Sequence, residues 1–294
     1  MKPIRVLVLG GSGRIGTLLR HAWAQDLERG RVKGIELVFQ TRQAEPSHPD
    51  DLIWHVLGET PQAVRDAPPF DCMIVLSGIT PKPDADFTLN TQIGAASLRA
   101  AADLGIGHVL LASTSAVYGS ASDAPFAEID PLEPVNDYGR SKLEMEQACQ
   151  PQARALGVGL CSLRIGNVAG ADALLMSGAA LASHETLQLD CFEDGGTPVR
   201  SYIGPISLAQ VMISLVRRRA QLPFALNIAA PHPVTMGALA EAAKMPVTLR
   251  PTQNNAHQHI TLACDALSAL HDFDQAESTA DEILRQWQSL TGRA

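Results

Sequence analysis

The start of the chain joins a short apolar segment to a glycine-rich turn and then to a helical pattern. Residues 4–9 are apolar except for Arg5, which is typical of a strand buried on both faces of a parallel sheet. Gly10, Gly13 and Gly16 follow at once, and a helical pattern continues through Ala24. Glycines allow a tight turn and the close approach of a pyrophosphate, and the amide groups at a helix start attract anions. The segment therefore predicts a dinucleotide-binding turn in an α/β fold.

Alternating strands and helices extend this pattern along the first half of the chain. Apolar runs predict strands at residues 35–40, 71–76, 108–113 and 159–164, and helical patterns cover residues 90–104 and 137–149. Strands separated by helices in this way form a doubly wound parallel sheet of the Rossmann type. Ligands of such sheets bind outside the carboxyl ends of the strands, so we expect the site there.

The pattern becomes less regular after about Asn167. We expect helices at residues 171–182, 207–219, 235–244 and 276–290, and strands at residues 187–192 and 224–229. The division predicts an NAD(P)-binding domain at residues 1–166, with a return segment near residues 201–230. A smaller C-terminal lobe, mainly residues 167–294, is expected to bind the substrate.

A tyrosine and a lysine stand four residues apart on the helix expected at residues 137–149. Side chains at this spacing project from the same helix face, so Tyr138 and Lys142 can act together. An ammonium beside a phenol favours the phenolate and lowers the tyrosine pKa. The pair therefore predicts a group that exchanges a proton with an alcohol or ketone near neutral pH.

Several further segments share the spacing of one enzyme family. They are Ser113-Thr-Ser-Ala-Val-Tyr118-Gly119, the spacing of Glu128, Pro131 and Pro134, Leu163-Arg164-Ile-Gly-Asn167-Val-Ala-Gly170, and Arg200-Ser-Tyr-Ile203. Together with the Gly-x-x-Gly-x-x-Gly turn, they resemble the extended short-chain dehydrogenases/reductases, and within them the NAD-dependent epimerase/dehydratase family with its UDP-glucose 4-epimerase-like members. The resemblance spans roughly residues 4–230.

The resemblance implies a catalytic set of Thr114, Tyr138 and Lys142. The Thr114 hydroxyl would donate to the substrate oxygen, Tyr138 would act as acid and base, and Lys142 would lower the Tyr138 pKa and bind the nicotinamide ribose. The alternative interpretation of Thr114 is a strand-end hydroxyl that caps a turn. The residues expected to bind the cofactor are Gly10, Gly13, Arg14, Ile15, Gly16, Arg42, Ser77, Gly78, Tyr138 and Lys142, and those expected to contact the substrate are Thr80, Thr114, Asn167 and Arg200.

The second expected strand ends without an acidic residue. An Asp or Glu at this point would bind the ribose 2′-hydroxyl of NAD. The chain instead reads Gln40-Thr41-Arg42, and a guanidinium can pair with a 2′-phosphate. This favours NADP over NAD, with Arg14 as a second contact. In the alternative interpretation, Arg42 is a solvated loop residue and NAD is held by backbone groups.

Five positions at three sites depart from the family's pattern. Ser115-Ala116 stands where the family's dehydratases have acidic residues, which disfavours the elimination of water. Ser201 replaces the usual Asp after Arg200, and Ser207-Leu208 replaces an acidic pair that often opens the next helix. These changes count against recognition of a nucleotide sugar, whereas Arg200 itself is retained and can bind a diphosphate.

Three function hypotheses follow from these residues. The first is a nucleotide-sugar epimerase that oxidises a carbinol, lets the keto intermediate reorient and reduces it from the other face. The alternative is an NADPH-dependent carbonyl reductase or alcohol dehydrogenase with a smaller substrate, and the third is a nucleotide-binding sensor without turnover. Asn167 and Arg200 favour the epimerase, whereas Arg42 and Ser201 count against it.

The composition indicates which partners to expect. A net charge of −8 disfavours nucleic acid, and no apolar run approaches the roughly 18 residues of a membrane span. Five scattered cysteines are typical of reduced thiols in a cytosolic protein, and His257 and His259 lack a third metal ligand. We therefore expect a cytoplasmic enzyme without a metal, with a small-molecule substrate. Residues 95–102 and 138–149 could form the helical face of a homodimer, although a packed core explains the alanines equally well.

Overall fold

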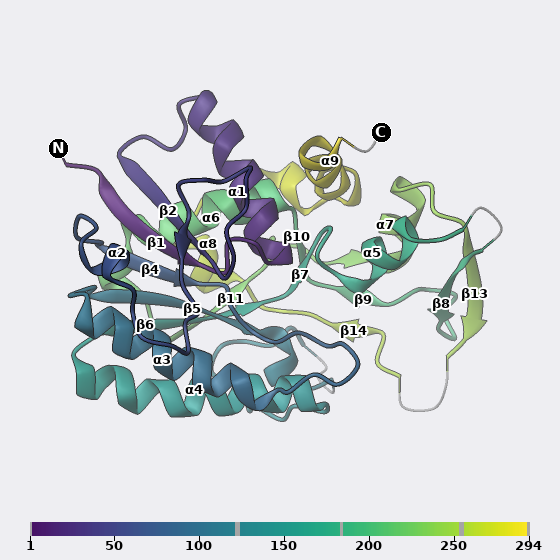
Figure 1. The fold of residues 1–294 in the computed structure, drawn as a ribbon. Helices are drawn as coiled ribbons and strands as arrows, with labels where there is room; N and C mark the ends of the chain where they lie inside the picture. The colour runs from purple at the N-terminus through teal and green to yellow at the C-terminus, as the bar shows by residue number, and fades with distance from the viewer. Residues whose placement is uncertain (1, 121–123, 183–184, 253–255, 293–294) are drawn as a thin grey trace. The chain divides into compact units, whose positions relative to one another are not determined.

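A seven-stranded sheet organises the fold. The computed structural model describes residues 2–120, 124–182, 185–252 and 256–292. The strands of the sheet are β1 (Ile4–Leu9), β2 (Ile35–Thr41), β3 (Leu52–Ile53), β4 (Cys72–Val75), β5 (His108–Thr114), β6 (Gly159–Ile165) and β11 (Ala225–Ile228). They lie in the order β11-β6-β5-β4-β1-β2-β3, and the pairs from β3 to β5 run parallel (Figure 1). This is the Rossmann strand order, so the predicted fold class is confirmed.

Helices cover this sheet on both sides. On one side α3 (Thr88–Asp103) packs along α4 (Asp137–Leu156), and α1 (Arg14–Glu28) lies on the other side (Figure 1). The helix α4 continues past the predicted end at residue 149, and Gly157 in a left-handed conformation terminates it. The helices α1 and α4 therefore begin beyond the carboxyl ends of β1 and β5, the strands that precede them.

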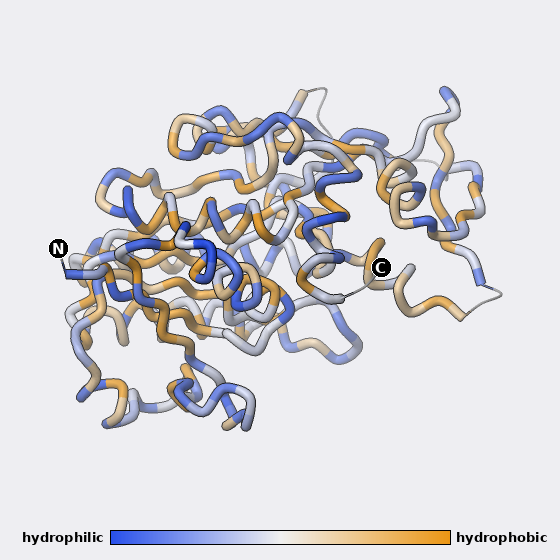
Figure 2. The backbone as a smooth tube through the Cα atoms, turned by 90° about the horizontal axis from the view of Figure 1, so that it is seen from above, coloured by the Kyte–Doolittle hydropathy of each residue, from blue (hydrophilic) through white to orange (hydrophobic). Residues whose placement is uncertain are grey.

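The core of the sheet is apolar along whole strands rather than at alternate positions. Val6 to Leu9 of β1 and all of β4 are buried, and Figure 2 shows the hydrophobic colour following the central strands. Each such side chain contributes roughly 1.5–3 kcal/mol when fully buried. Strands buried on both faces lose the period-two pattern, which is why β1 and β4 appear as continuous apolar runs.

The contacts divide the chain into two compact units. The first consists of residues 1–119, 132–164 and 213–226, and the second of residues 120–131, 165–212 and 227–294. The remaining helices are α2 (Gln62–Arg65), α5 (Ala173–Ala179), α6 (Pro205–Arg217), α7 (Met236–Ala242), α8 (Asp265–Ser268) and α9 (Ala280–Thr291). The helix α9 begins later than predicted, because Asp274 and Glu277 form a capping box on a separate 3-10 turn at Gln275–Ser278.

Short strands build the second unit. They are β7 (Asn167–Val168), β8 (Leu187–Cys191), β9 (Val199–Arg200), β10 (Tyr202–Ile203), β12 (Val234–Thr235), β13 (Val247–Pro251) and β14 (His259–Ile260). The strand β10 pairs with β7, β13 pairs with β8, and β9 lies between β12 and β14. Most have only two residues, too few to show a periodic pattern, so the sequence predicted only β8 among them. In the described part of the chain, no helix has the length and apolar content needed to cross a membrane.

Candidate active site

The glycine turn joins β1 to α1. The turn is closed by the Gly13 amide, which donates to the Gly10 carbonyl at 3.0 Å. A Cβ at Gly16 would lie 2.2 Å from that same carbonyl oxygen, so only glycine allows the helix to start this close to the strand. The first turn of α1 reads Arg-Ile-Gly-Thr and carries no carboxylate. The backbone amides at a helix start and the helix dipole favour an anion such as a pyrophosphate.

Gln40 supports this turn from the end of β2. Its buried side chain accepts a hydrogen bond from the Gly10 amide at 2.9 Å and donates to the Trp54 carbonyl, and its own carbonyl accepts from the Gly11 amide at 3.0 Å. The residue nearest the expected acid position is therefore committed to holding the turn. Arg42, two residues further along, is exposed to solvent.

The loops after β1 and β4 meet through a hydrogen bond. Arg14 Nη2 donates to Thr80 Oγ1 at 2.7 Å, which joins a predicted cofactor residue to a predicted substrate residue. Ser77 and Gly78 lead into the same loop, and a Cβ at Gly78 would lie 3.1 Å from Lys142 Nζ. The predicted residues Arg14, Gly78, Thr80 and Lys142 are therefore close together in the first unit.

The three candidate catalytic residues come from β5 and α4. Thr114 ends β5, Tyr138 lies in the first turn of α4, and Lys142 follows one turn later. Thr114 hydrogen-bonds Tyr138, and its Oγ1 also accepts from the Ala116 amide at 3.3 Å. The Thr114 hydroxyl therefore caps the following turn and contacts Tyr138, and its donation to a substrate oxygen stays a prediction. Lys142 is 4% exposed, and its Nζ donates to the Ala112 carbonyl at 2.9 Å.

Gly139 allows α4 to begin against the end of β5. The Gly139 amide donates to Asn136 Oδ1 at 2.8 Å, which caps the helix. A Cβ at this position would lie 2.4 Å from the Ala116 carbonyl oxygen, so a larger residue would push Tyr138 away from Thr114. Sequence reasoning missed this residue, although its place inside Tyr-x-x-x-Lys was the available signal.

Burial controls the two titratable groups of the set. It raises the pKa of Tyr138, while the hydrogen bond from Thr114 and the charge of Arg14 act in the opposite direction. The net shift is opposite to the one expected from the sequence, because desolvation outweighs the neighbouring charge. Burial also lowers the pKa of Lys142 to about 8, although Glu146 and Cys149 raise it. At neutral pH the pair is therefore a phenol and an ammonium, the state that donates a proton to a substrate oxygen.

Asn90 is a further polar residue of this region that sequence reasoning missed. It is fully buried, its Oδ1 accepts from the Ile79 amide at 2.8 Å, and its Nδ2 donates to Ser141 Oγ at 3.0 Å. These contacts tie the loop after β4 to α4. An amide side chain on the buried face of an alanine-rich helix was the signal that could have found it.

Asn167 and Arg200, the other two predicted substrate residues, lie in the second unit. Asn167 is the first residue of β7, and its backbone amide donates to the Ser201 carbonyl at 2.9 Å. Arg200 Nη1 donates to the carbonyls of Val199 and Gln258 at 2.7 and 2.6 Å, and its Nη2 donates to the His257 carbonyl at 3.4 Å. The Arg200 guanidinium therefore clamps β9 to the segment that leads into β14.

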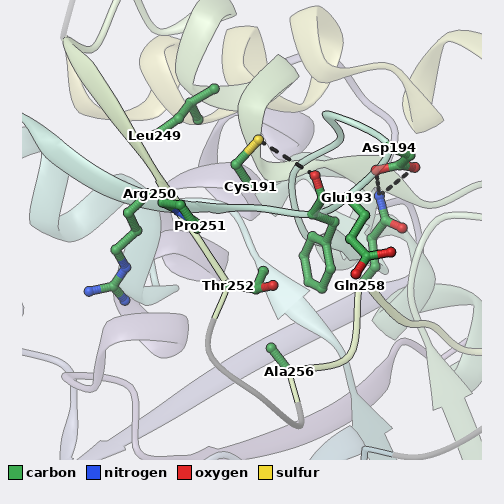
Figure 3. A pocket seen from close by; sticks show the side chains of 10 residues that line it. Cys191, Glu193, Asp194, Leu249, Arg250, Pro251, Thr252, Ala256 and Gln258 are labelled. Atoms are coloured by element: carbon green, nitrogen blue, oxygen red, sulfur yellow. Dashed lines mark hydrogen bonds between the residues drawn. The ribbon is translucent and has the colours of Figure 1, made fainter.

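A pocket of about 880 Å³ opens within the second unit (Figure 3). Its lining residues are Cys191, Phe192, Glu193, Asp194, Leu249, Arg250, Pro251, Thr252, Ala256 and Gln258. Figure 3 shows Arg250 pointing away from Glu193 and Gln258, and Arg250 pairs with Asp190 at 2.9 Å. The charged residues that line this pocket are Glu193, Asp194 and Arg250, of which Arg250 is paired with Asp190.

The serines that replace the family's acids make contacts inside the second unit. The buried Ser201 Oγ accepts from the Leu262 amide at 2.9 Å. The amides of Ile206 and Ser207 donate to Gln286 Oε1 at 3.1 and 3.0 Å, so Gln286 caps the start of α6. The Ser207 hydroxyl also contacts the side chains of Glu277 and Gln286, so both serines join segments of the second unit.

Metal and disulfide chemistry have no visible basis in the described ranges. No group of three or more His, Cys, Asp or Glu side chains there is arranged to hold a metal ion. The five cysteines are free thiols, and all except Cys191 are buried.

Comparison with known sequences identifies the family. Residues 6–229 match the sequence model of the NAD-dependent epimerase/dehydratase family. The chain belongs to this family. Among the relatives of this NAD-dependent epimerase/dehydratase, the UDP-glucose 4-epimerase of Azospirillum brasilense is 33% identical over 191 residues. That match covers 61% of this chain and 54% of the relative, so the chain spans about half the length of that enzyme.

Solved structures show the same fold along nearly the whole chain. The UDP-glucose 4-epimerase from Brucella ovis in complex with NAD has a TM-score of 0.78 and 22% identity, and the match covers 96% of this chain and 97% of that one. A dTDP-glucose 4,6-dehydratase from Streptomyces venezuelae has a TM-score of 0.75 and 18% identity, with 98% of each chain covered. Epimerases and dehydratases thus share this architecture, and identities this low establish the fold alone.

Proposed function

We propose that the chain is an NAD(P)-dependent nucleotide-sugar epimerase that works by transient hydride transfer, with Tyr138 as acid and base. The observation that carries the proposal is the grouping of Thr114, Tyr138 and Lys142 at the end of β5 and the start of α4, beside the loop that contains Gly78. The names of the relatives support a nucleotide sugar as substrate.

The chemistry follows from the positions of the three side chains. When bound, the nicotinamide supplies the acceptor and donor of the hydride. The phenolate form of Tyr138 takes the hydroxyl proton of the carbinol as the C–H bond breaks and becomes the phenol, and this phenol returns the proton when the ketone is reduced from the other face. The Thr114 hydroxyl donates to the same substrate oxygen. The Lys142 ammonium stabilises the phenolate that forms on Tyr138.

The residues of the first unit fit a dinucleotide. The amides at the start of α1 suit the pyrophosphate, and the backbone at Gly78 beside Lys142 suits the nicotinamide ribose. Gln40 is engaged with the turn, and the exposed Arg42 guanidinium suits a 2′-phosphate. We therefore propose NADP ahead of NAD. Residues 1–166, with a return segment near residues 201–230, bind the cofactor, and residues 167–294 mainly bind the substrate.

A second candidate function is an NADPH-dependent carbonyl reductase or alcohol dehydrogenase acting on a smaller substrate. Two observations in the second unit favour it. The Arg200 guanidinium is engaged by three backbone carbonyls, and the pocket of Figure 3 faces the carboxylates of Glu193 and Asp194. Carboxylates repel a diphosphate, so this surface suits a neutral substrate better.

The first experiment identifies the cofactor. The purified protein is denatured, any released nucleotide is identified, and the apo form is titrated with NADH and NADPH and assayed with UDP-galactose. Tightly held nucleotide and interconversion of UDP-galactose and UDP-glucose support the epimerase. An empty protein that binds NADPH, leaves UDP-galactose unchanged and reduces small carbonyl compounds contradicts it and selects the reductase.

We further propose that the enzyme is a cytoplasmic homodimer. The alanine-rich α3 packs against α4 at the surface of the first unit, and two such helices can form a helical interface with a second copy. Sedimentation of the purified protein measures the oligomeric state, and a monomer at micromolar concentration contradicts the dimer.

A further inference from the structure

A buried ion pair lies one helical turn beyond Lys142. Glu146 of α4 is 2% exposed, Arg164 of β6 is 3% exposed, and Arg164 Nη2 lies 2.9 Å from Glu146 Oε2. Arg164 Nη1 donates to the Tyr118 hydroxyl at 2.9 Å, and the Ser113 hydroxyl donates to Glu146 Oε1. All four residues belong to the first unit and are buried. We call this set the Glu146–Arg164 network.

The Glu146–Arg164 network completes a row of contacts between β5 and α4. The last three residues of β5 each contact α4. The Ala112 carbonyl accepts from Lys142, the Ser113 hydroxyl donates to Glu146, and Thr114 hydrogen-bonds Tyr138. Because the three contacts run along one strand and one helix, loss of the middle one lets the strand end shift relative to the helix.

Stability alone does not account for a buried ion pair here. Taking a carboxylate and a guanidinium out of water is costly, and apolar side chains of similar volume often stabilise a core as well or better. Arg164 meets Glu146 through both Nε and Nη2 and spends a further donor on Tyr118, so its orientation is fixed by several hydrogen bonds. Compared with an apolar core, the ion pair therefore adds a fixed orientation of its side chains.

We propose that the Glu146–Arg164 network is a positioning element that holds Tyr138 and Lys142 in register with Thr114. The inference rests on the proposed function of those three residues. It assigns a role to Tyr118 and Arg164, which the sequence singled out and the chemistry leaves unused. None of the four network residues touches the reacting atoms, so each acts through the catalytic residues beside it.

The charges around Lys142 determine how the inference is tested. Glu146 and Cys149 face Lys142 from α4, and Arg164 reaches it from β6 through Glu146. Replacing Glu146 alone would change the local charge as well as the geometry. The double variant Glu146→Leu/Arg164→Met removes one charge of each sign, so its effects on Tyr138 report geometry. Ser113→Ala removes only the contact to the strand end.

The experiment compares the double variant and Ser113→Ala with wild type and with Glu36→Gln. Glu36 pairs with Arg5 at the opposite end of the same sheet, at 2.7 Å, so this control removes an ion-pair charge far from the site. The chain has three tyrosines, so ¹³C-tyrosine NMR gives three signals, and Tyr138→Phe assigns the one of interest. Thermal unfolding, NADPH affinity and kcat with UDP-galactose are measured on the same samples.

We expect the Tyr138 signal to move in the double variant and kcat to fall by at least about tenfold, because small misplacements of catalytic groups are costly. NADPH affinity stays within about twofold, and Glu36→Gln matches wild type. A folded double variant with an unchanged Tyr138 signal and kcat overturns the inference. If the double variant does not fold, Ser113→Ala decides by the same two readouts. Turnover by Tyr138→Phe would instead overturn the proposed function. In that case the Tyr138 NMR signal of the double variant would still test whether the network positions Tyr138.

Discussion

The β5–α4 region of the first unit and residues 199–208 of the second unit both carry buried polar side chains, but they use them differently. In the first region, side chains contact other side chains, as in the contacts of Glu146 with Ser113 and Arg164. In the second, Arg200 and Ser201 contact backbone groups, as Ser201 does with the Leu262 amide, whereas Tyr202 and Ser207 contact side chains of the same unit. Polar groups that face one another can be tuned for chemistry, whereas those that satisfy the backbone serve the fold.

The difference indicates where this chain has diverged from its relatives' pattern. The first unit retains the family's turn, strand end and Tyr-x-x-x-Lys helix, so its chemistry is expected to be the family's. The second unit replaces acids of the pattern with Ser201 and Ser207, and both residues now hold strands and helices together. We therefore expect this protein to differ from its relatives more in its substrate than in its chemistry.

The largest effect is expected for Tyr138→Phe, which removes the proton donor and keeps the ring against Phe87. We expect kcat to fall by on the order of 10²–10⁴-fold, because that is the usual contribution of a general acid or base. Cofactor affinity should stay within about twofold, measured by fluorescence titration with NADPH. Full turnover by the variant would show that the first region does not carry the chemistry.

The second prediction concerns pH. Reduction of a ketone needs the Tyr138 phenol and the Lys142 ammonium, and burial lowers the pKa of Lys142 to about 8. The rate of ketone reduction should therefore be level below about pH 8 and fall up to tenfold per unit above it. Because the unfolded state keeps this proton up to about 10.5, the Lys142 contribution to stability rises with pH between the two values.

The pH–rate profile of Lys142→Arg is the check on this assignment. A guanidinium stays charged throughout the range, so the alkaline fall should move to higher pH in the variant. If the alkaline fall in rate stays at the same pH, a group other than Lys142 causes it, and the assigned role of Lys142 is wrong.

A smaller effect is expected at the cofactor. Arg42→Ala should raise the NADPH dissociation constant about tenfold, or ~1.4 kcal/mol, because a charge-assisted contact to the 2′-phosphate is lost. The NADH dissociation constant should be unchanged. The exposed Arg29 at the end of α1 provides the matched control as Arg29→Ala. Equal losses for both nucleotides would contradict the role of Arg42 in NADP recognition.

The smallest effect on activity is expected in the second unit. Gln286→Ala leaves the amides of Ile206 and Ser207 without their acceptor, which should cost ~1–3 kcal/mol of unfolding free energy. Chemical denaturation measures this loss, and Gln288→Ala on the same helix is the control. A kcat near that of wild type would support a structural role for this region, in contrast to the β5–α4 region. A large loss of kcat with normal stability would mean that this region also serves the chemistry.

The sequence predicted the first region well because its signals are local. The glycine turn, the apolar strands and the spacing of Tyr138 and Lys142 can all be identified within short windows. The raised pKa of Tyr138 could not be predicted, because it depends on burial by distant segments. The two-residue strands β7, β9 and β14 and the cap that Gln286 gives to α6 were also missed, since they depend on partners far along the chain.

The division of the chain into units has a consequence for its synthesis. The first unit includes residues 213–226, which contribute the end of α6 and the start of the edge strand β11. A ribosome must therefore release residue 226 of 294 before the first unit can close. Until then, the apolar edge of β6 lacks its neighbour and is a natural target for chaperones. A pause in translation after residue 226 has emerged from the ribosome would favour folding, whereas a pause before residue 213 has emerged would prolong the exposure of that edge.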